Sequence, residues 1–184
     1  MHSFQLSHTA RIIRYGAVVA CPTEAVYGLS CHPLIPEAVS RILELKQRSI
    51  DKGLILVASD ATQLYPFVKD PSVLDQQNIK DSWPGATTWL VPASDDTPSW
   101  LTGSHDTIAV RVTEHPIMAE LCQRCGHALV STSANISGRA PAVNSLHTRK
   151  MFGNGLDLIL HAETGPNKQV SKIIDATSGK LVRA

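Results

Sequence analysis

The chain has 184 residues, of which 43% are hydrophobic and 18% charged, and its 17 Lys and Arg against 16 Asp and Glu give a net charge of +1. The apolar fraction is too high for a disordered chain, and the length suffices for a real core. We therefore expect residues 1–184 to fold as a single domain. The balanced charge argues against a protein that holds nucleic acid by an overall positive field, whereas a local basic patch or a small anionic ligand is compatible with it.

No stretch of the sequence is long enough to cross a bilayer as a helix. The longest apolar runs, at 17–21 and 54–58, fall far short of the roughly 20 residues required. The short run behind Arg11 and Arg14 imitates a signal peptide only vaguely, since it ends in Pro-Thr-Glu without a small-residue cleavage pattern. We interpret it as part of the mature protein.

The four cysteines have spacings that do not suggest a disulfide framework. A reduced, cytoplasmic setting is the simplest prediction. Cys122 and Cys125 form a C-x-x-C pair inside a helical stretch, with no second pair at zinc spacing. Ordinary helix residues are the favoured interpretation of this pair, and a metal or redox site is the alternative.

Apolar periodicity and turn residues predict helices alternating with strands along the chain. The predicted helices cover residues 4–15, 36–47, 71–82, 116–125 and 144–151. The predicted strands cover residues 17–21, 54–58, 87–91, 107–112, 129–131, 156–160, 172–176 and 180–182. Pro36 suits a first helical turn, Asp60 suits the N-cap of a further short helix, and Gly126 ends a helix. The alternation indicates an α/β or α+β domain with helices packed on a mixed sheet.

Several widespread catalytic motifs are absent from the sequence. There is no G-x-x-x-x-G-K-[ST] phosphate loop, no G-x-S-x-G nucleophile elbow, no H-E-x-x-H zinc motif and no calcium loop. Gly153-Asn154-Gly155 begins like a dinucleotide fingerprint, but the third glycine is missing and no strand precedes it. The chemistry must therefore be sought in less regular polar segments.

The loop before the strand at 54–58 carries three cations, Lys46, Arg48 and Lys52, close together. Cations at a helix C-terminus are stabilised by the helix dipole, and a solvated charged loop is the commoner meaning of such a run. The alternative is a clamp for a polyphosphate, because Arg offers a planar fork and Lys a point charge to a concentrated anion.

Two further polar segments follow predicted strands, where α/β folds place ligand contacts. Residues 131–135, Ser-Thr-Ser-Ala-Asn, offer hydroxyls, an amide and backbone N–H groups that suit a nucleotide or an amino acid, or they simply form turns. In residues 22–29, PTEAVYGL, either Thr23 lines the mouth of a pocket or Thr23 or Glu24 caps a tight turn.

The strand at 107–112 carries one charge in an otherwise apolar sequence. Thr107 and Arg111 are four residues apart, so their side chains lie on the same side of the strand. A buried arginine is costly unless it meets an anion, so Arg111 either pairs with a core carboxylate or holds a ligand carboxylate or phosphate. Ser171 and Arg183, late in the chain, do not stand out on their own.

In this order, the segments resemble the YrdC/TsaC family of threonylcarbamoyl-AMP synthases. The matching stretches are PTEAVYGL (22–29), LKQRSIDKGLILVAS (45–59), WPGATTWLVPA (83–93), TIAVRV (107–112), STSANISG (131–138) and VSKIIDATSGKLVRA (170–184). The resemblance covers nearly the whole chain, and six motifs in register are far more specific than any one of them. The length resembles the short bacterial form, which lacks the additional C-terminal domain of longer relatives.

The resemblance implies a twisted mixed sheet with helices around a large, positively charged cavity. It also implies condensation of L-threonine, bicarbonate or CO2, and ATP into L-threonylcarbamoyl-AMP and pyrophosphate, with Mg2+ accompanying ATP and no tightly bound protein-ligated metal. The product would feed N6-threonylcarbamoyladenosine formation at position 37 of tRNAs reading ANN codons, through a separate TsaD-type transferase complex. Any direct contact with RNA would be weak, and no membrane partner is expected.

Carried over position by position, the resemblance gives a catalytic role to Lys46, Arg48 and Lys52. The implied ATP-binding residues are Arg48, Lys52, Thr107, Ser133 and Arg183. The implied threonine-binding residues are Thr23, Arg111, Ser131 and Ser171, and Asn135 has a supporting role. Two positions depart from the family pattern and concern amino-acid recognition: Ala25, where many relatives have threonine, and Val57, where longer relatives have a histidine that touches threonine.

Three other functions are weighed against this one. An RNA-binding module would use a basic cavity for phosphates, but the net charge is low and no aromatic-rich stacking motif is present among three Trp, three Tyr and three Phe. Carbamoyl transfer in hydrogenase maturation uses a similar domain inside a much larger protein. A sugar-phosphate lyase-like enzyme would need an acidic metal site, which the sequence does not indicate.

Overall fold

A computed structural model describes residues 3–165 and 171–183. Within them the strands are β1 (Val19–Pro22), β2 (Tyr27–Cys31), β3 (Ile55–Ala58), β4 (Thr87–Pro92), β5 (Thr107–Val112), β6 (Leu129–Ser133), β7 (Leu158–Ile159), β8 (Lys172–Asp175) and β9 (Leu181–Arg183). They form one sheet in the order β7-β1-β2-β6-β3-β5-β4-β8-β9. The β1–β7, β3–β5 and β4–β8 pairs are parallel and the other pairs antiparallel, which confirms the predicted mixed sheet.

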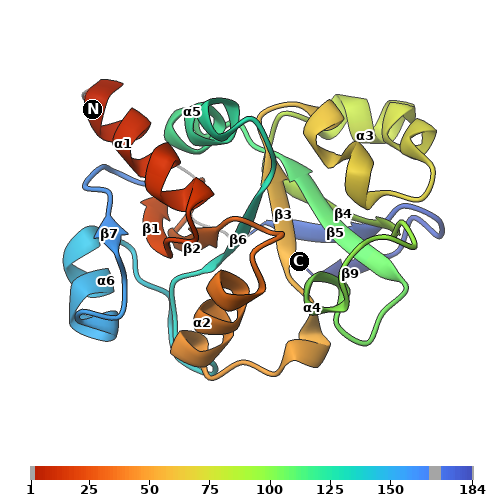
Figure 1. The fold of residues 1–184 in the computed structure, drawn as a ribbon. Helices are drawn as coiled ribbons and strands as arrows, with labels where there is room; N and C mark the ends of the chain where they lie inside the picture. Colours follow the sequence, from red (N-terminus) through yellow and green to blue (C-terminus); the bar gives the residue numbers. More distant parts are fainter. Residues whose placement is uncertain (1–2, 166–170, 184) are drawn as a thin grey trace.

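Helices lie on both faces of this sheet (Figure 1). The α-helices are α1 (Ser3–Arg14), α2 (Pro36–Lys46), α3 (Gln77–Ser82), α4 (Ser99–Thr102), α5 (Pro116–Cys125) and α6 (Ser145–Phe152). Three short 3-10 segments are η1 (Ile50–Lys52), η2 (Ala61–Phe67) and η3 (Pro71–Asp75). None of the helices in the described ranges is long and apolar enough to cross a membrane.

Two apolar clusters hold these layers together. One cluster joins α1 and α5, which lie side by side, to β1, β3 and β6 through residues such as Ile13, Met118 and Leu129. The other joins the opposite face of the sheet to α2, α4 and η2 through residues such as Ile42 and Leu64. Burying both faces of the central strands explains why their sequences are nearly continuous apolar runs.

The local signals for helix boundaries are confirmed. Pro36 is the first residue of α2, and Gln47 ends it in the left-handed conformation with φ 49°. The side chain of Asp60 accepts a hydrogen bond from the Thr62 N–H at the start of η2. Gly126 ends α5 with φ 79°, a conformation that costs glycine little.

The structure departs from the predicted elements in several places. The helix expected over 71–82 is η3 followed by α3, because Gln76 between them has an extended ψ of 139°. The turn expected after 22 leads into β2, a strand that pairs with both β1 and β6. The pairing of Gly28 with Ser133 also extends β6 beyond its predicted end at 131. The strand expected over 156–160 is only the two-residue β7.

Candidate functional site

A cavity of about 330 Å³ opens on one face of the sheet. In β5, Thr107, Ala109 and Arg111 line it, whereas the alternate residues Ile108 and Val110 are fully buried in the core cluster on the other face. The two-residue period of a strand thus separates cavity-facing from core-facing side chains.

Nine of the sequence-predicted site residues line this cavity, although they come from distant parts of the chain. They are Thr23, Arg48, Lys52, Thr107, Arg111, Ser131, Ser133, Ser171 and Arg183. Lys46 and Asn135 are not among the described residues that line it. The cavity is therefore cationic and rich in hydroxyl groups, and it has room for small ligands.

Arg48 and Lys52 lie at the edge of the cavity near the start of β3. The Arg48 Nη2 donates to the backbone oxygens of Lys52 and Gly53 at 3.3 and 3.0 Å. Among the described residues, neither cation forms an ion pair with a carboxylate. Burial lowers the pKa of Arg48, as expected for a charge that lacks a neutralising partner. This edge is suited to an anion.

Arg183, on the last strand, is joined to Ser171. Its Nη2 donates to the Ser171 backbone oxygen at 2.9 Å and to Oγ at 3.0 Å, and the Thr88 hydroxyl donates to the same Oγ at 3.4 Å. Burial lowers the pKa of Arg183, and the nearby charges of Arg111 and Arg48 lower it further. The charges of Arg48 and Arg111 thus act on Arg183.

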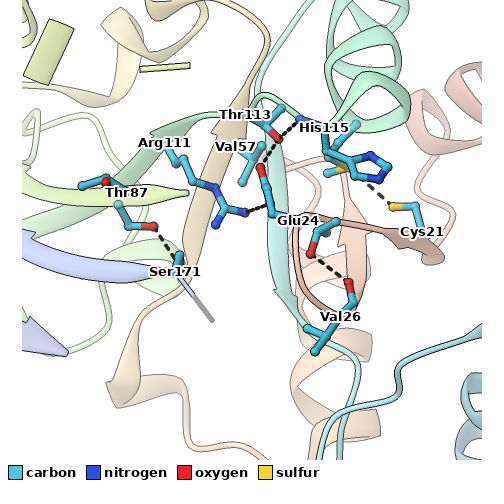
Figure 2. A network of polar contacts seen from close by, with 12 residues as sticks. Cys21, Glu24, Val26, Val57, Thr87, Arg111, Thr113, His115 and Ser171 are labelled. Atoms are coloured by element: carbon cyan, nitrogen blue, oxygen red, sulfur yellow. Dashed lines mark hydrogen bonds and ion pairs between the residues drawn. The ribbon is translucent and has the colours of Figure 1, made fainter. Parts of the chain in front are cut away.

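Arg111 meets a carboxylate that is also part of the cavity wall. Its Nη2 lies 3.4 Å from Glu24 Oε2, and the two side chains are 7% and 5% exposed. Figure 2 shows the guanidinium directed at Glu24, which comes from the turn between β1 and β2. The two alternatives for Arg111, an internal salt bridge and a ligand-facing position, are thus compatible in one geometry.

Lys46 and Asn135 brace the loop that follows β6. Lys46 is 2% exposed. Its ammonium donates to the backbone oxygen of Ser133 and to the backbone and side-chain oxygens of Asn135 at 3.0 and 3.2 Å. Ser133 Oγ donates to Asn135 Oδ1 at 2.6 Å. Both residues contact the cavity-lining Ser133 from behind.

The two departures from the family pattern occupy different places. Ala25 lines the cavity, in the turn where the Thr23 hydroxyl donates to the Val26 oxygen at 2.8 Å. Val57 is fully buried, pairs with Arg111 across β3 and β5, and packs in the cluster under α1 and α5. Its side chain lies beside Arg111 on the same face of the sheet.

Four polar residues that line the cavity are not among the sequence-predicted site residues: Glu24, Thr102, His105 and Thr132. Glu24 was considered only as a helix or turn cap, although its position in a turn beside a buried strand and the need of Arg111 for a carboxylate could have paired them. His105, in the loop after α4, also lines the cavity. A single histidine in a loop carries no pattern that would have singled it out.

The four cysteines are free and buried. Burial raises the pKa of Cys125 to about 11 and raises that of Cys122 as well. Within residues 3–165 and 171–183, no group of three or more His, Cys, Asp or Glu side chains could hold a metal ion. The C-x-x-C pair therefore belongs to the packing face of α5, as favoured from the sequence.

The fold and the cavity define a mixed α/β protein with a cationic, hydroxyl-lined cavity. The chain belongs to the Sua5/YciO/YrdC family, described as telomere recombination, whose pattern matches residues 11–184. It is 50% identical to a threonylcarbamoyl-AMP synthase of Nitrosococcus oceani over 95% of this chain and 94% of that protein. It is 46% identical to one of Pseudomonas fluorescens over 98% and 97% of the two chains.

Solved structures agree with this assignment. The P. abyssi Sua5 complexed with L-threonine is 32% identical, with a TM-score of 0.91 over 98% of this chain and 53% of that one. The chain thus spans about half the length of that Sua5. The E. coli YciO has a TM-score of 0.86 at 24% identity, over 99% and 89% of the two chains, and so shares the fold.

Proposed function

We propose that the cavity is the active site for the threonylcarbamoyl-AMP synthase activity of this chain. The enzyme is a nucleotidyltransferase that joins L-threonine, bicarbonate or CO2, and ATP into L-threonylcarbamoyl-AMP, with release of pyrophosphate. The observation that carries the proposal is the convergence of Arg48, Lys52, Arg111 and Ser133 on one hollow.

The reaction needs no nucleophile from the protein. The threonine amine captures CO2 as a carbamate, and a carbamate oxygen attacks the α-phosphorus of ATP while pyrophosphate leaves. The chain's contribution is to hold two anionic reactants together and to neutralise the charge that develops on phosphate. Fixed cations in a partly buried cavity suit that task, because their effect is stronger there than in water.

For the nucleotide, we assign Arg48, Lys52, Thr107, Ser133 and Arg183, all of which line the cavity. Arg48 and Lys52 lack carboxylate partners among the described residues, so their charge is available to a triphosphate. Lys46 and Asn135 would act on the reaction through Ser133, whose backbone and hydroxyl they contact.

For L-threonine, we assign Arg111 to the carboxylate, with Thr23, Ser131 and Ser171 supplying hydroxyl groups. Thr107 and Arg111 are four residues apart on β5, which is about 13 Å at 3.3 Å per residue. That span separates a triphosphate from an amino-acid carboxylate while leaving the carbamate between them. The threonine found in the P. abyssi Sua5 structure supports an amino-acid subsite in this fold.

Mg2+ would arrive with ATP as part of the substrate. The described residues contain no acidic cluster for it, so phosphate oxygens and water would supply most of its ligands, as is common for Mg2+. The metal would neutralise phosphate charge, and the protein groups would orient the phosphates.

The product is a reactive mixed anhydride, so a transferase must take it up quickly. We propose delivery to a TsaD-type complex that modifies tRNAs reading ANN codons, in the cytoplasm. The free, buried cysteines fit a reducing compartment.

The experiment that tests the function incubates the full chain with ATP, Mg2+, bicarbonate and each amino acid in turn, and measures pyrophosphate. Release that requires both L-threonine and bicarbonate is expected. Release with neither requirement, or none at all with every amino acid, would contradict the proposed function.

A further inference from the structure

Glu24 is a buried carboxylate in the wall of a cavity that otherwise carries cations. Its Oε2 lies 3.4 Å from Arg111 Nη2, in an ion pair whose two side chains are less than a tenth exposed. A buried ion pair contributes little net stability compared with apolar residues of the same volume. Its presence at the ligand site therefore calls for another explanation.

The carboxylate is fixed in place. Glu24 Oε1 accepts a hydrogen bond from the Thr113 hydroxyl at 2.5 Å. The same hydroxyl oxygen accepts a hydrogen bond from the backbone N–H of His115 at 3.1 Å. Figure 2 shows Glu24 between Arg111 and Thr113, with a dashed line to each. The carboxylate is thus held from both sides.

The backbone of this turn is equally constrained. The N–H of Gly165 donates to the backbone oxygen of Thr23 at 2.9 Å. A Cβ on Gly165 would lie 2.7 Å from the backbone oxygen of Glu24. Only glycine permits this close approach. The backbone of the turn that carries Glu24 is therefore held against Gly165.

Without Glu24, the cavity would hold two uncompensated guanidinium groups close together. Arg183 donates hydrogen bonds to Ser171. The charge of Arg111 also contributes to the lowered pKa of Arg183. Two arginines that face one hollow make a strong site for phosphate. Glu24 cancels one of these charges, whereas Arg48 and Lys52, near the start of β3, keep theirs.

We propose that Glu24 is a specificity-determining residue that reserves the Arg111 side of the cavity for a zwitterionic amino acid and excludes phosphate from it. A neutral Arg–Glu pair still offers guanidinium N–H groups to an amino-acid carboxylate. A phosphate dianion would meet the Glu24 carboxylate, and specificity of this kind commonly depends on a repulsive element. Because Glu24 neutralises Arg111 alone, the triphosphate is directed to Arg48, Lys52 and Arg183. The inference rests on the proposed function through its choice of L-threonine.

The test measures binding of radiolabelled L-threonine to the full chain, with and without inorganic phosphate at constant ionic strength. In the wild-type chain, phosphate should leave the Kd for L-threonine within about twofold. In Glu24→Gln, phosphate should weaken L-threonine binding by about tenfold or more, as expected for one charge-assisted contact. Glu120→Gln is the matched control, because Glu120 pairs with Arg124 on α5 outside the cavity and should behave as wild type.

A second pair of variants keeps the test decisive if Glu24→Gln does not fold. Thr113→Val keeps the carboxylate but removes its hydrogen bond, and should raise the KM for L-threonine about tenfold while the KM for ATP stays within about twofold. Thr113→Ser retains the hydroxyl and should restore the wild-type value. A merely structural role would alter both KM values or neither.

The outcomes separate the two proposals. A wild-type chain that binds no L-threonine contradicts the proposed function itself. If the wild type binds L-threonine but Glu24→Gln gains no sensitivity to phosphate, the inference about Glu24 is wrong and the function stands. A Thr113→Val chain with an unchanged KM for L-threonine also overturns the inference.

Discussion

Lys46 at the C-terminal end of α2 and Asn135 in the loop after β6 are joined by two hydrogen bonds. The Lys46 ammonium donates to the Asn135 backbone and Oδ1 oxygens at 3.0 and 3.2 Å, and also to the Ser133 oxygen. A cation buried to 2% exposure thus fixes the end of the strand that carries Ser133.

Replacing Lys46 should therefore destabilise the protein. In Lys46→Met, three acceptors lose their donor, and we expect a loss of about 3 kcal/mol in the free energy of unfolding, measured by urea denaturation. Lys69→Met is the control, because Lys69 makes only a 3.8 Å pair with Asp95 and its side chain is 63% exposed. Equal unfolding midpoints for the two variants would show that the Lys46 contacts contribute no stability.

Replacing Arg48 should affect catalysis rather than folding. Arg48 lines the cavity, and its loss removes a charged hydrogen-bond donor from the phosphates. We expect kcat/KM for ATP to fall by about 10- to 150-fold in Arg48→Ala, while the protein stays folded in the absence of urea. Wild-type rates of ATP-dependent pyrophosphate release in this variant would remove Arg48 from the mechanism.

Gly103 ends α4 and allows the segment that carries Lys52 to pack closely against that helix end. It has φ +68°, and a Cβ there would lie 2.3 Å from the Asp51 backbone oxygen. Gly103→Ala should cost about 3 kcal/mol or more, since strain and a backbone clash combine, and it should raise the KM for ATP by displacing Lys52. Gly126→Ala has a similar φ of +79° but nothing within 4 Å, so its cost should be only about 1 kcal/mol. Calorimetric melting of both variants tests the difference.

Stability should fall in mild acid because of a histidine pair. The rings of His32 and His127 lie 4.0 Å apart, and burial, followed by the charge of His127, lowers the pKa of His32. The unfolded chain takes up a proton at His32 near pH 6.5, its ordinary value, before the folded chain does. The contribution of neutral His32 to the free energy of unfolding is therefore fully present above about pH 6.5. It is lost as the pH falls toward the pKa of His32 in the folded chain.

Urea midpoints between about pH 5.5 and 7.5 measure this dependence. His32→Asn keeps an acceptor for the Leu34 N–H, which donates to His32 Nδ1 at 3.0 Å, and it should flatten the profile. His147→Asn, at an exposed position of α6, should leave the profile unchanged. An equally steep profile in His32→Asn would contradict this source of pH dependence.

The sequence by itself determined those helix boundaries and strand faces that depend only on neighbouring residues. Pro36, Asp60 and Gly126 mark helix boundaries through backbone geometry and capping, which depend on few neighbours. The alternation in residues 107–112 likewise determined that Thr107 and Arg111 share a face. Residue types and motif order also led to the prediction that nine cations and hydroxyl residues lie together, and these nine line one cavity, whereas Lys46 does not.

Only the tertiary structure decided how those residues meet. The existence of β2 depends on pairing with β1 and β6, which no short segment encodes. Lys46 proved to lie behind the cavity and Glu24 in its wall, because each position is fixed by partners about 90 residues away along the chain, Ser133 for Lys46 and Arg111 and Thr113 for Glu24. Charge compensation is a property of distances in space, and those distances arise only when the strands assemble into one sheet.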